Sequence, residues 1–287
     1  MKKAIYISAA AIVVFCAVYL FIFPDVSRFR KENPKRTSLM EYRLGQWKKA
    51  GKKMSIFQVW APFSKISPYL VKAVIIAEDD KFWTHEGFDY EAIGEAIEKN
   101  IKAGRFRAGG STISQQLAKN LFLTPEKTVF RKLKEAALTW RLERALTKRR
   151  ILEIYLNVVE WGDGVFGVEA ASRRYFGKTA LDLGPMEAAR LVSTLPSPIR
   201  FNPTGEQRFV LSRSAVIYNI MVKRGIVLPE YEEIRNTPAE EAALALEPPS
   251  AAADAKPSEE QGLPAGPPAQ SIVEEPAPGK PAKAGGR

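Results

Sequence analysis

The sequence has very little of the two residues on which most metal and redox sites depend. Among its 287 residues there is one cysteine, Cys16, and one histidine, His85. An intramolecular disulfide, a cysteine-based zinc site and a site with several histidine ligands are therefore excluded. The nucleotide-binding pattern G-x-x-x-x-G-K-[ST] is also absent, so the glycine-rich segments do not form a standard phosphate loop.

Acidic residues are the second deficit. The chain has 32 Asp and Glu against 43 Lys and Arg, a net charge of +11. Such an excess favours an anionic partner, such as nucleic acid, an anionic lipid surface or a phosphorylated substrate. No recognised nucleic-acid-binding motif accompanies the basic residues, so we expect no nucleic-acid role. Apolar residues make up 46% of the chain, enough to build a sizeable core.

Charge is missing from one long stretch near the N-terminus. Residues 4–23, AIYISAAAIVVFCAVYLFIF, carry no charged side chain, and 20 such residues can cross a bilayer core of about 30 Å. The sequence that follows is bulky and then basic, unlike a signal-peptide cleavage site. We therefore expect a cytoplasmic tip and an uncleaved transmembrane anchor over residues 1–25. Basic residues on both sides leave the orientation open by the positive-inside rule.

Two further regions differ from the rest in composition. Residues 26–60 carry ten Lys or Arg and two Glu, which suits either a solvated linker or a segment that lies on an anionic bilayer surface. Nine prolines fall within residues 248–287 among Ala, Gly, Ser and charges, too polar a mixture to offset chain entropy. We expect a basic juxtamembrane segment at 26–60, a folded domain at 61–235 and a disordered Pro/Ala-rich tail at 236–287.

The folded domain has the apolar spacing of helices. Ser67 and Pro68 suit a helix start, and no segment alternates with a sustained period of two, so we expect a mainly α, single-domain body. The segment 126–157 is long enough for one kinked helix or two. The helical segments are 67–82, 89–104, 111–123, 126–157, 167–177, 184–196 and 208–225.

Three acids, Glu78, Asp79 and Asp80, close the apolar stretch VKAVIIA. A carboxylate near a helix C-terminus opposes the helix dipole, and beside buried residues its pKa can rise to suit a general base. Solvated acids are the simpler alternative. His85, nearby, suits a hydrogen-bonded core histidine better than a catalyst.

The stretch RAGGSTISQQLAKN, residues 107–120, combines two glycines with Ser111 and Thr112 at a helix start. Glycine lets a ligand approach the backbone, and the first N–H groups of a helix can bind an anion. An ordinary capped helix is the alternative.

Charged residues recur every four positions in the next segment. Lys127, Arg131 and Glu135 project from one helical face, with Lys132 alongside. Such cations could hold a diphosphate, with the carboxylate orienting groups around it. An ion-paired surface helix is the alternative.

Together these motifs resemble the peptidoglycan glycosyltransferases of the lysozyme-like membrane family, glycosyltransferase family 51, and specifically its monofunctional biosynthetic transglycosylases. The resemblance covers about residues 60–205, and six motifs occur in the family's order. They are E-D-x-x-F-x-x-H-x-G at 78–87, G-x-S-T-x-x-Q-Q-x-x-K-N at 109–120, R-K-x-x-E at 131–135, K-x-x-I-L-E-x-Y-L-N at 148–157, GVFGVEAASRRYFGK at 164–178 and EAARL…LPSP at 187–198.

The resemblance implies roles for individual residues. The family's catalytic base falls on Glu78 and its second acid on Glu135. The implied substrate-binding residues are Lys119, Lys127, Arg131, Lys132, Ser111, Thr112, Gln115 and Gln116. The implied supporting residues are Asp79, Phe82, His85, Gly87, Glu153 and Asn157. Lys127 stands where the family commonly has Arg, which keeps the charge but loses bidentate contact.

The resemblance also implies a reaction. Lipid II and the growing lipid-linked glycan strand are the expected substrates, and polymerisation inverts the anomeric carbon and releases undecaprenyl diphosphate. Glu78 would take the proton of the attacking 4-hydroxyl, and Glu135 would orient the site, assist departure or help hold a divalent cation, Mg or Mn. Lipid substrates on the outer face of the cytoplasmic (inner) membrane imply a single-pass protein with its N-terminus inside. Other cell-wall synthesis or division proteins are further candidate partners.

Two rival functions stay open at this stage. A lytic transglycosylase or lysozyme-like enzyme also uses a carboxylate, but it needs no cations for a diphosphate. A non-catalytic, membrane-anchored cell-wall scaffold would need neither the catalytic carboxylate nor the cations. Transpeptidase activity is not expected, because the chain has no S-x-x-K and no K-T-G motif.

Overall fold

A computed structural model describes most of the central part of the chain. Contacts divide the chain into residues 1–236 and 237–287, and the second unit, with the predicted tail, lies outside the described residues. Most of the predicted anchor lies outside them too. None of the described helices is long and apolar enough to span a membrane. The described residues are 3, 6–8, 24–103, 109–126 and 128–228.

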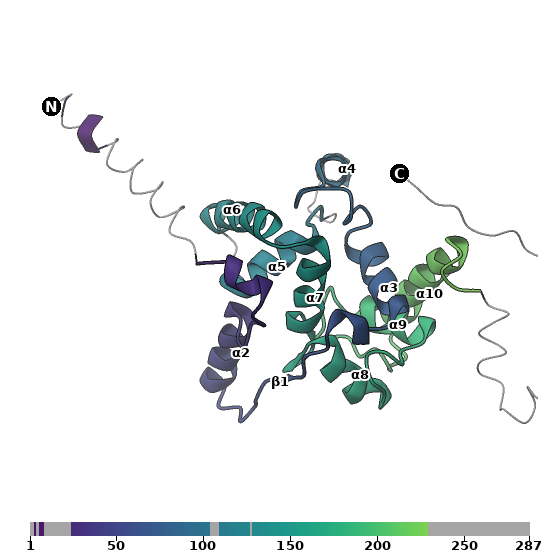
Figure 1. Cartoon of the computed structure of the whole chain (residues 1–287). Coiled ribbons are helices and arrows are strands. Elements are labelled where there is room, and N and C mark those ends of the chain that lie inside the picture. The colour runs from purple at the N-terminus through teal and green to yellow at the C-terminus, as the bar shows by residue number, and fades with distance from the viewer. Residues whose placement is uncertain (1–2, 4–5, 9–23, 104–108, 127, 229–287) are drawn as a thin grey trace, which may run out of the picture. The chain divides into compact units, whose positions relative to one another are not determined.

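Helices dominate this region, which confirms the mainly α class (Figure 1). The predicted 126–157 segment forms two helices, because Leu146 is extended and the Thr147 side chain caps the second helix by accepting from the N–H of Arg150. The helices are η1 (Ser27–Arg30), α2 (Ser38–Lys49), η2 (Phe63–Lys65), α3 (Pro68–Glu78), α4 (Tyr90–Ala103), α5 (Ile113–Phe122), α6 (Val129–Ala145), α7 (Lys148–Val158), α8 (Val168–Phe176), α9 (Pro185–Ser193) and α10 (Arg208–Lys223).

A small sheet is the part of the fold that periodicity does not predict. It consists of β1 (Phe57–Gln58), β2 (Glu160–Gly162) and β3 (Val165–Phe166), in the order β1-β3-β2. β1 runs parallel to β3, and β2 runs antiparallel to β3. Strands of two or three residues are too short to show a period of two.

Helix α7 lies at the centre of the core. A helix that is apolar on most sides is buried on most sides, and α7 packs against α5, α6 and α8. Figure 1 shows it between α5 and α6 on one side and α3, α9 and α10 on the other. Its buried residues are Ile151, Leu152, Ile154, Tyr155, Leu156, Asn157 and Val158.

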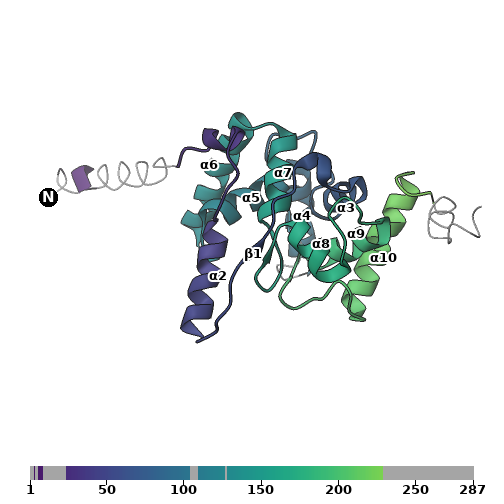
Figure 2. The ribbon, with the colours of Figure 1, turned by 60° about the horizontal axis from the view of Figure 1, so that its bottom comes forward.

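The basic segment 26–60 packs onto the body. Helix α2 lies against α5 (Figure 2), and Val26, Phe29, Met40 and Trp47 are buried. A freely solvated linker is therefore excluded for these residues. The cations of this segment other than Arg43 are exposed.

Candidate functional site

Glu78 ends helix α3, and its carboxylate is largely buried among polar partners. One oxygen accepts a hydrogen bond from Nε2 of Gln116 at 3.0 Å, and the other lies 3.4 Å from Nη2 of Arg213. Burial raises the pKa of Glu78, while Gln116, Arg213 and Lys119 offset part of the rise. This environment suits a carboxylate that can accept a proton.

The Gln116 amide is oriented by a residue of the core helix. The hydroxyl of Tyr155 donates to Oε1 of Gln116 at 3.0 Å, so the amide N–H₂ group faces Glu78. Tyr155 is fully buried, and burial raises its pKa well above the ordinary value. Tyr155 therefore stays protonated and acts as a hydrogen-bond donor. Tyr155 on α7 donates to Gln116 on α5, which in turn donates to Glu78 on α3.

A cavity of about 330 Å³, here called the cationic cavity, lies beside Gln116. Arg43, Lys119 and Arg131 line it, together with one acid, Glu160. The Lys119 ammonium forms no hydrogen bond or ion pair with any residue that the structure describes, and its burial lowers the pKa of Lys119. Nε of Arg131 is buried and likewise without a partner in the described chain. An anion is the ligand that such donors require.

Arg43 enters this cavity from α2, and Glu160 from β2. Nε and Nη2 of Arg43 lie 2.9 and 2.8 Å from Oε2 of Glu160, and Nη1 donates to Gln46 at 2.9 Å. Burial raises the pKa of Glu160. The pair therefore holds a guanidinium at the cavity wall.

A second cavity, of about 350 Å³, lies on the other side of Glu78 and is here called the acidic cavity. Lys81 is its one cationic lining residue among the residues that the structure describes. Glu78 therefore stands between two cavities of opposite charge, since it lines one and contacts the other through Gln116. The acids of the second cavity are Glu78, Asp79, Asp80, Asp89 and Glu95.

Asp79 and His85 fasten the site to the start of α5. Nε2 of His85 donates to Oδ1 of Asp79 at 2.9 Å, because the N–H of Gly87 donates to Nδ1 of the same ring at 3.0 Å. The N–H of Ile113 donates to Oδ2 of Asp79 at 2.8 Å. The helix start that the sequence offered as an anion site is thus occupied by a carboxylate of the chain itself.

The capping residues of α5 also have partners within the chain. Thr112 and Gln115 form a capping box, and the Thr112 hydroxyl donates to the carbonyl of Gly87 at 2.7 Å. Both side chains are buried. Ser111 is exposed at the edge of the acidic cavity. Of the four polar residues predicted from this motif to bind substrate, Gln116 is the one that contacts Glu78.

Gly87 and Phe82 hold their places in the first motif for steric and packing reasons. Gly87 has φ +93°, a backbone conformation that residues with a side chain rarely adopt. A Cβ there would also lie only 2.9 Å from both Glu143 Cγ and Thr139 Cγ2, so a larger residue would clash as well. Phe82 is fully buried and meets His85 edge-on, at 6.3 Å between ring centroids.

Glu135 is buried, and both of its oxygens are paired. Nη1 of Arg131 lies 2.7 Å from one oxygen and Nζ of Lys132 lies 2.5 Å from the other. The described residues hold no cluster of three or more His, Cys, Asp or Glu that could bind a metal. Each oxygen of Glu135 thus already pairs with a cation of α6. Lys127 lies outside the described residues.

Comparison with known proteins shows the family of the chain. A family model described as Transglycosylase matches residues 48–222. The chain belongs to the transglycosylase family. Similar proteins include the biosynthetic peptidoglycan transglycosylases of Aromatoleum aromaticum, Azoarcus sp. and Dechloromonas aromatica, each 50% identical to it. These alignments cover 70, 67 and 64% of this chain and 89, 83 and 80% of the respective relatives.

Two other residues of the transglycosylase motifs, Asn157 and Glu153, form contacts outside the two cavities. Asn157 accepts from the N–H of Ala61 at 2.7 Å and donates to its carbonyl at 2.8 Å, which ties the chain before α3 to α7. Glu153 accepts from Nη1 of Arg150 at 2.9 Å. Both act away from the cavities.

Four residues of the site were not among those predicted from the sequence: Arg43, Glu160, Arg213 and Tyr155. Tyr155 and Glu160 lie in or beside transglycosylase motifs, so a signal for them was present. Arg43 and Arg213 lie outside the resemblance at 60–205, on α2 and α10, and only the fold brings them to the site.

Proposed function

We propose that the protein is a peptidoglycan glycosyltransferase of cell-wall synthesis that polymerises lipid II, with Glu78 as general base. One observation carries the proposal: a buried carboxylate of raised pKa stands between an acidic cavity and a cavity with unpartnered cations. In a reaction that joins a neutral hydroxyl to a sugar diphosphate, a base can accept the proton of the hydroxyl, while cations can stabilise the negative charge of the departing diphosphate.

The charges assign the two substrates to the two cavities. The lipid-linked glycan donor places its reacting diphosphate in the cationic cavity, because the acids of the other cavity would repel a phosphate group placed directly beside Glu78. Lipid II, the acceptor, brings the 4-hydroxyl of its terminal GlcNAc to Glu78 from the acidic cavity. The oxygen then attacks the anomeric carbon from the face opposite the diphosphate, which inverts that carbon.

In this step the proton and the leaving group move to opposite sides. Glu78 takes the hydroxyl proton, and the C–O bond to the diphosphate breaks, which releases undecaprenyl diphosphate. Lys119 and Arg131 stabilise the charge that develops on it, and Arg43 adds a third cation. Glu135 positions Arg131 and Lys132 through its two ion pairs.

The rival glycan-cleaving reaction fits less well. A lytic enzyme protonates a sugar oxygen and has no anionic leaving group, so it would leave the buried donors of Lys119 and Arg131 without a partner. A non-catalytic scaffold would not account for a carboxylate whose pKa is raised by burial and whose oxygens are held by Gln116 and Arg213.

Membrane placement is part of the proposal. Residues 4–23 act as a single anchor, the N-terminus lies inside, and the domain lies outside the inner membrane, where both lipid-linked substrates are. Exposed apolar side chains on α4 and α6 support contact with lipid, since a soluble surface rarely gathers so many. They are Tyr90, Ile97, Ile101, Val129, Phe130, Leu133 and Trp140.

The decisive experiment supplies the purified full chain with lipid II. We expect longer glycan and released undecaprenyl diphosphate, unaffected by penicillin. Glu78→Gln should lower the rate at least about 100-fold, while Glu86→Gln, which removes an exposed acid of the same loop, should not. Shortening of preformed peptidoglycan without any polymer would overturn the assignment.

A further inference from the structure

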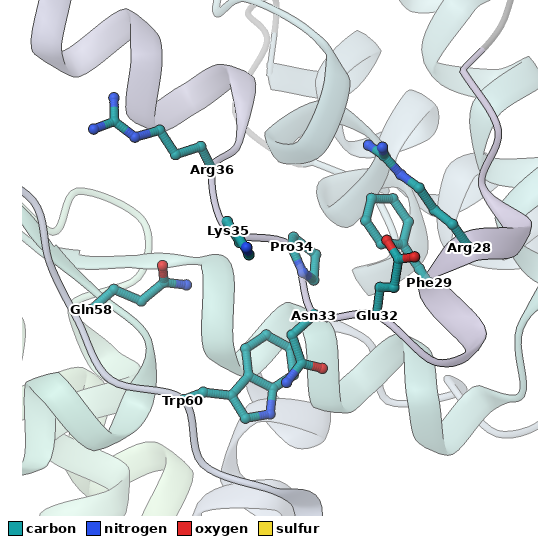
Figure 3. A pocket seen from close by; sticks show the side chains of 9 residues that line it. All are labelled: Arg28, Phe29, Glu32, Asn33, Pro34, Lys35, Arg36, Gln58 and Trp60. Carbon is teal, nitrogen blue, oxygen red and sulfur yellow. The ribbon is translucent and has the colours of Figure 1, made fainter.

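Away from the site, residues 28–36 enclose a cavity of about 880 Å³ together with the segment around β1, here called the N-terminal cavity. Figure 3 shows Trp60 at one end of it, Gln58 on one side, and Arg28 and Glu32 on the other. The cavity contains none of the residues assigned above to base, donor or acceptor. Its lining residues are Arg28, Phe29, Glu32, Asn33, Pro34, Lys35, Arg36, Gln58 and Trp60.

The wall of the N-terminal cavity is held in place by one residue of α7. Nε of Arg150 donates to the carbonyl of Phe29 at 2.8 Å, and Nη2 donates to the carbonyl of Glu32 at 2.8 Å and to Oδ1 of Asn33 at 2.7 Å. The same guanidinium lies 5.4 Å from the ring centroid of Trp60. Arg150 therefore joins the loop to the aromatic end of the cavity.

The cavity is positively charged and has polar groups for a second function. Arg28, Lys35 and Arg36 line it together with one acid, Glu32. Arg36 is paired with Glu41 at 2.9 Å, whereas Lys35 forms no hydrogen bond or ion pair within the described residues. The Gln58 amide and the Trp60 ring complete the lining. Cations bind phosphate, amides bind hydroxyls, and an aromatic ring covers the carbon face of a small polyol.

We propose that the N-terminal cavity binds the head group of an anionic phospholipid, a phosphate ester that carries a small polyol. The inference rests on the membrane placement proposed above, because the lining begins five residues after the uncharged run 4–23. A chain that leaves a bilayer there presents this cavity at the level of the lipid phosphates. A glycan strand fits less well, since its sugar backbone gives no reason for the excess of cations.

The test uses the full chain in neutral detergent micelles and soluble dihexanoyl lipids, followed by calorimetry. We expect dihexanoyl phosphatidylglycerol to bind, and dihexanoyl phosphatidylcholine to bind far more weakly. The Arg28→Gln/Lys35→Gln double variant should weaken phosphatidylglycerol binding about 30-fold, the contribution of two cations near an anionic lipid. Lys48→Gln/Lys49→Gln is the matched control, because it removes two exposed charges of α2 that do not line the cavity.

Further arms separate the possible sources of the phosphate. Trp60→Leu should weaken binding of the lipid but not of inorganic phosphate, and inorganic phosphate should bind more weakly than the lipid. The proposal is overturned if the control variant loses as much affinity, if inorganic phosphate binds as tightly, or if a glycan fragment displaces the lipid. Polymerisation by the same samples is measured separately. Glu78→Gln should bind the lipid normally, so failure of the catalytic assignment and failure of the lipid site give different results.

Discussion

At the scale of the residue, the protonation of Glu78 decides the pH range of the reaction. A general base works when deprotonated, and burial raises the pKa of this carboxyl. Activity should therefore fall, as the pH is lowered, at a higher pH than for an ordinary glutamate. Arg213 and Gln116 favour the charged form, which limits how far that boundary moves.

This balance gives a prediction for Arg213. Arg213→Gln removes a positive charge 3.4 Å from the carboxylate, so the pKa of Glu78 should rise further. The acidic side of the rate–pH profile should move to higher pH, with polymerisation on lipid II as the measurement. Arg208→Gln, an exposed position on the same helix, is the control. An unshifted profile would show that Arg213 does not act on the base.

The same raised pKa implies that the ionised carboxylate of Glu78 weakens the fold at neutral pH. A group whose folded-state pKa lies above its unfolded value stabilises the fold below the unfolded pKa, and that stability is lost as the pH rises through the folded pKa. Glu78→Gln removes this loss. Its melting temperature should exceed that of the wild type at neutral pH, and the gap should shrink as the pH falls. A gap that is absent or that grows at low pH would contradict the burial argument.

At the scale of the element, helix α2 is the unexpected part of the site. It precedes most of the family motifs, yet it carries Arg43 into the cationic cavity and pairs it with Glu160, 117 residues away. Removing Arg43 alone would leave a buried carboxylate unpaired. A fair test of the cation therefore changes both partners.

We predict that Arg43→Ala/Glu160→Gln keeps the fold but lowers kcat/KM for lipid II. The loss should be roughly tenfold to a hundredfold, the range for one charged hydrogen bond to a phosphate. Arg43→Lys should lie between this variant and the wild type, because it keeps the charge without the bidentate geometry. Melting curves of all three proteins provide the control. Normal kcat/KM in the double variant would remove Arg43 from the donor site.

Helices and cavities differed in how far the sequence could predict them. The helices followed from apolar spacing, which is local, but the spacing left open whether 126–157 forms one kinked helix or two, and the structure shows two, with the break near Thr147. The Asp79 carboxylate on the N–H of Ile113 joins residues 34 apart, and no local pattern announces such a bond. For that reason the start of α5 suggested an anion site that the structure fills with Asp79. The strands could not be predicted for a different reason. With only two or three residues each, they are too short to show an alternating apolar pattern.

At the scale of the whole molecule, the proposed catalytic site and the proposed membrane contact share the N-terminal region. Val26, Phe29, Met40 and Trp47 are buried against the body, while the cations of the same segment, apart from the partly buried Arg43, are exposed. The segment that follows the proposed anchor is therefore also a structural part of the catalytic domain.

Two truncations test this dual role. A chain that begins at Pro24 keeps η1 and α2, so it should melt like the full chain and polymerise lipid II in detergent at a similar rate. A chain that begins at Gly51 loses four buried apolar side chains, each worth about 1.5–3 kcal/mol, and it loses Arg43. Since a domain of this kind has only about 5–15 kcal/mol of net stability, the second chain should melt far lower or fail to fold. The family match begins at residue 48, so the match alone would favour a chain that starts near Gly51. Equal melting temperatures and equal kcat/KM for the two truncations would therefore show that α2 is only a tether.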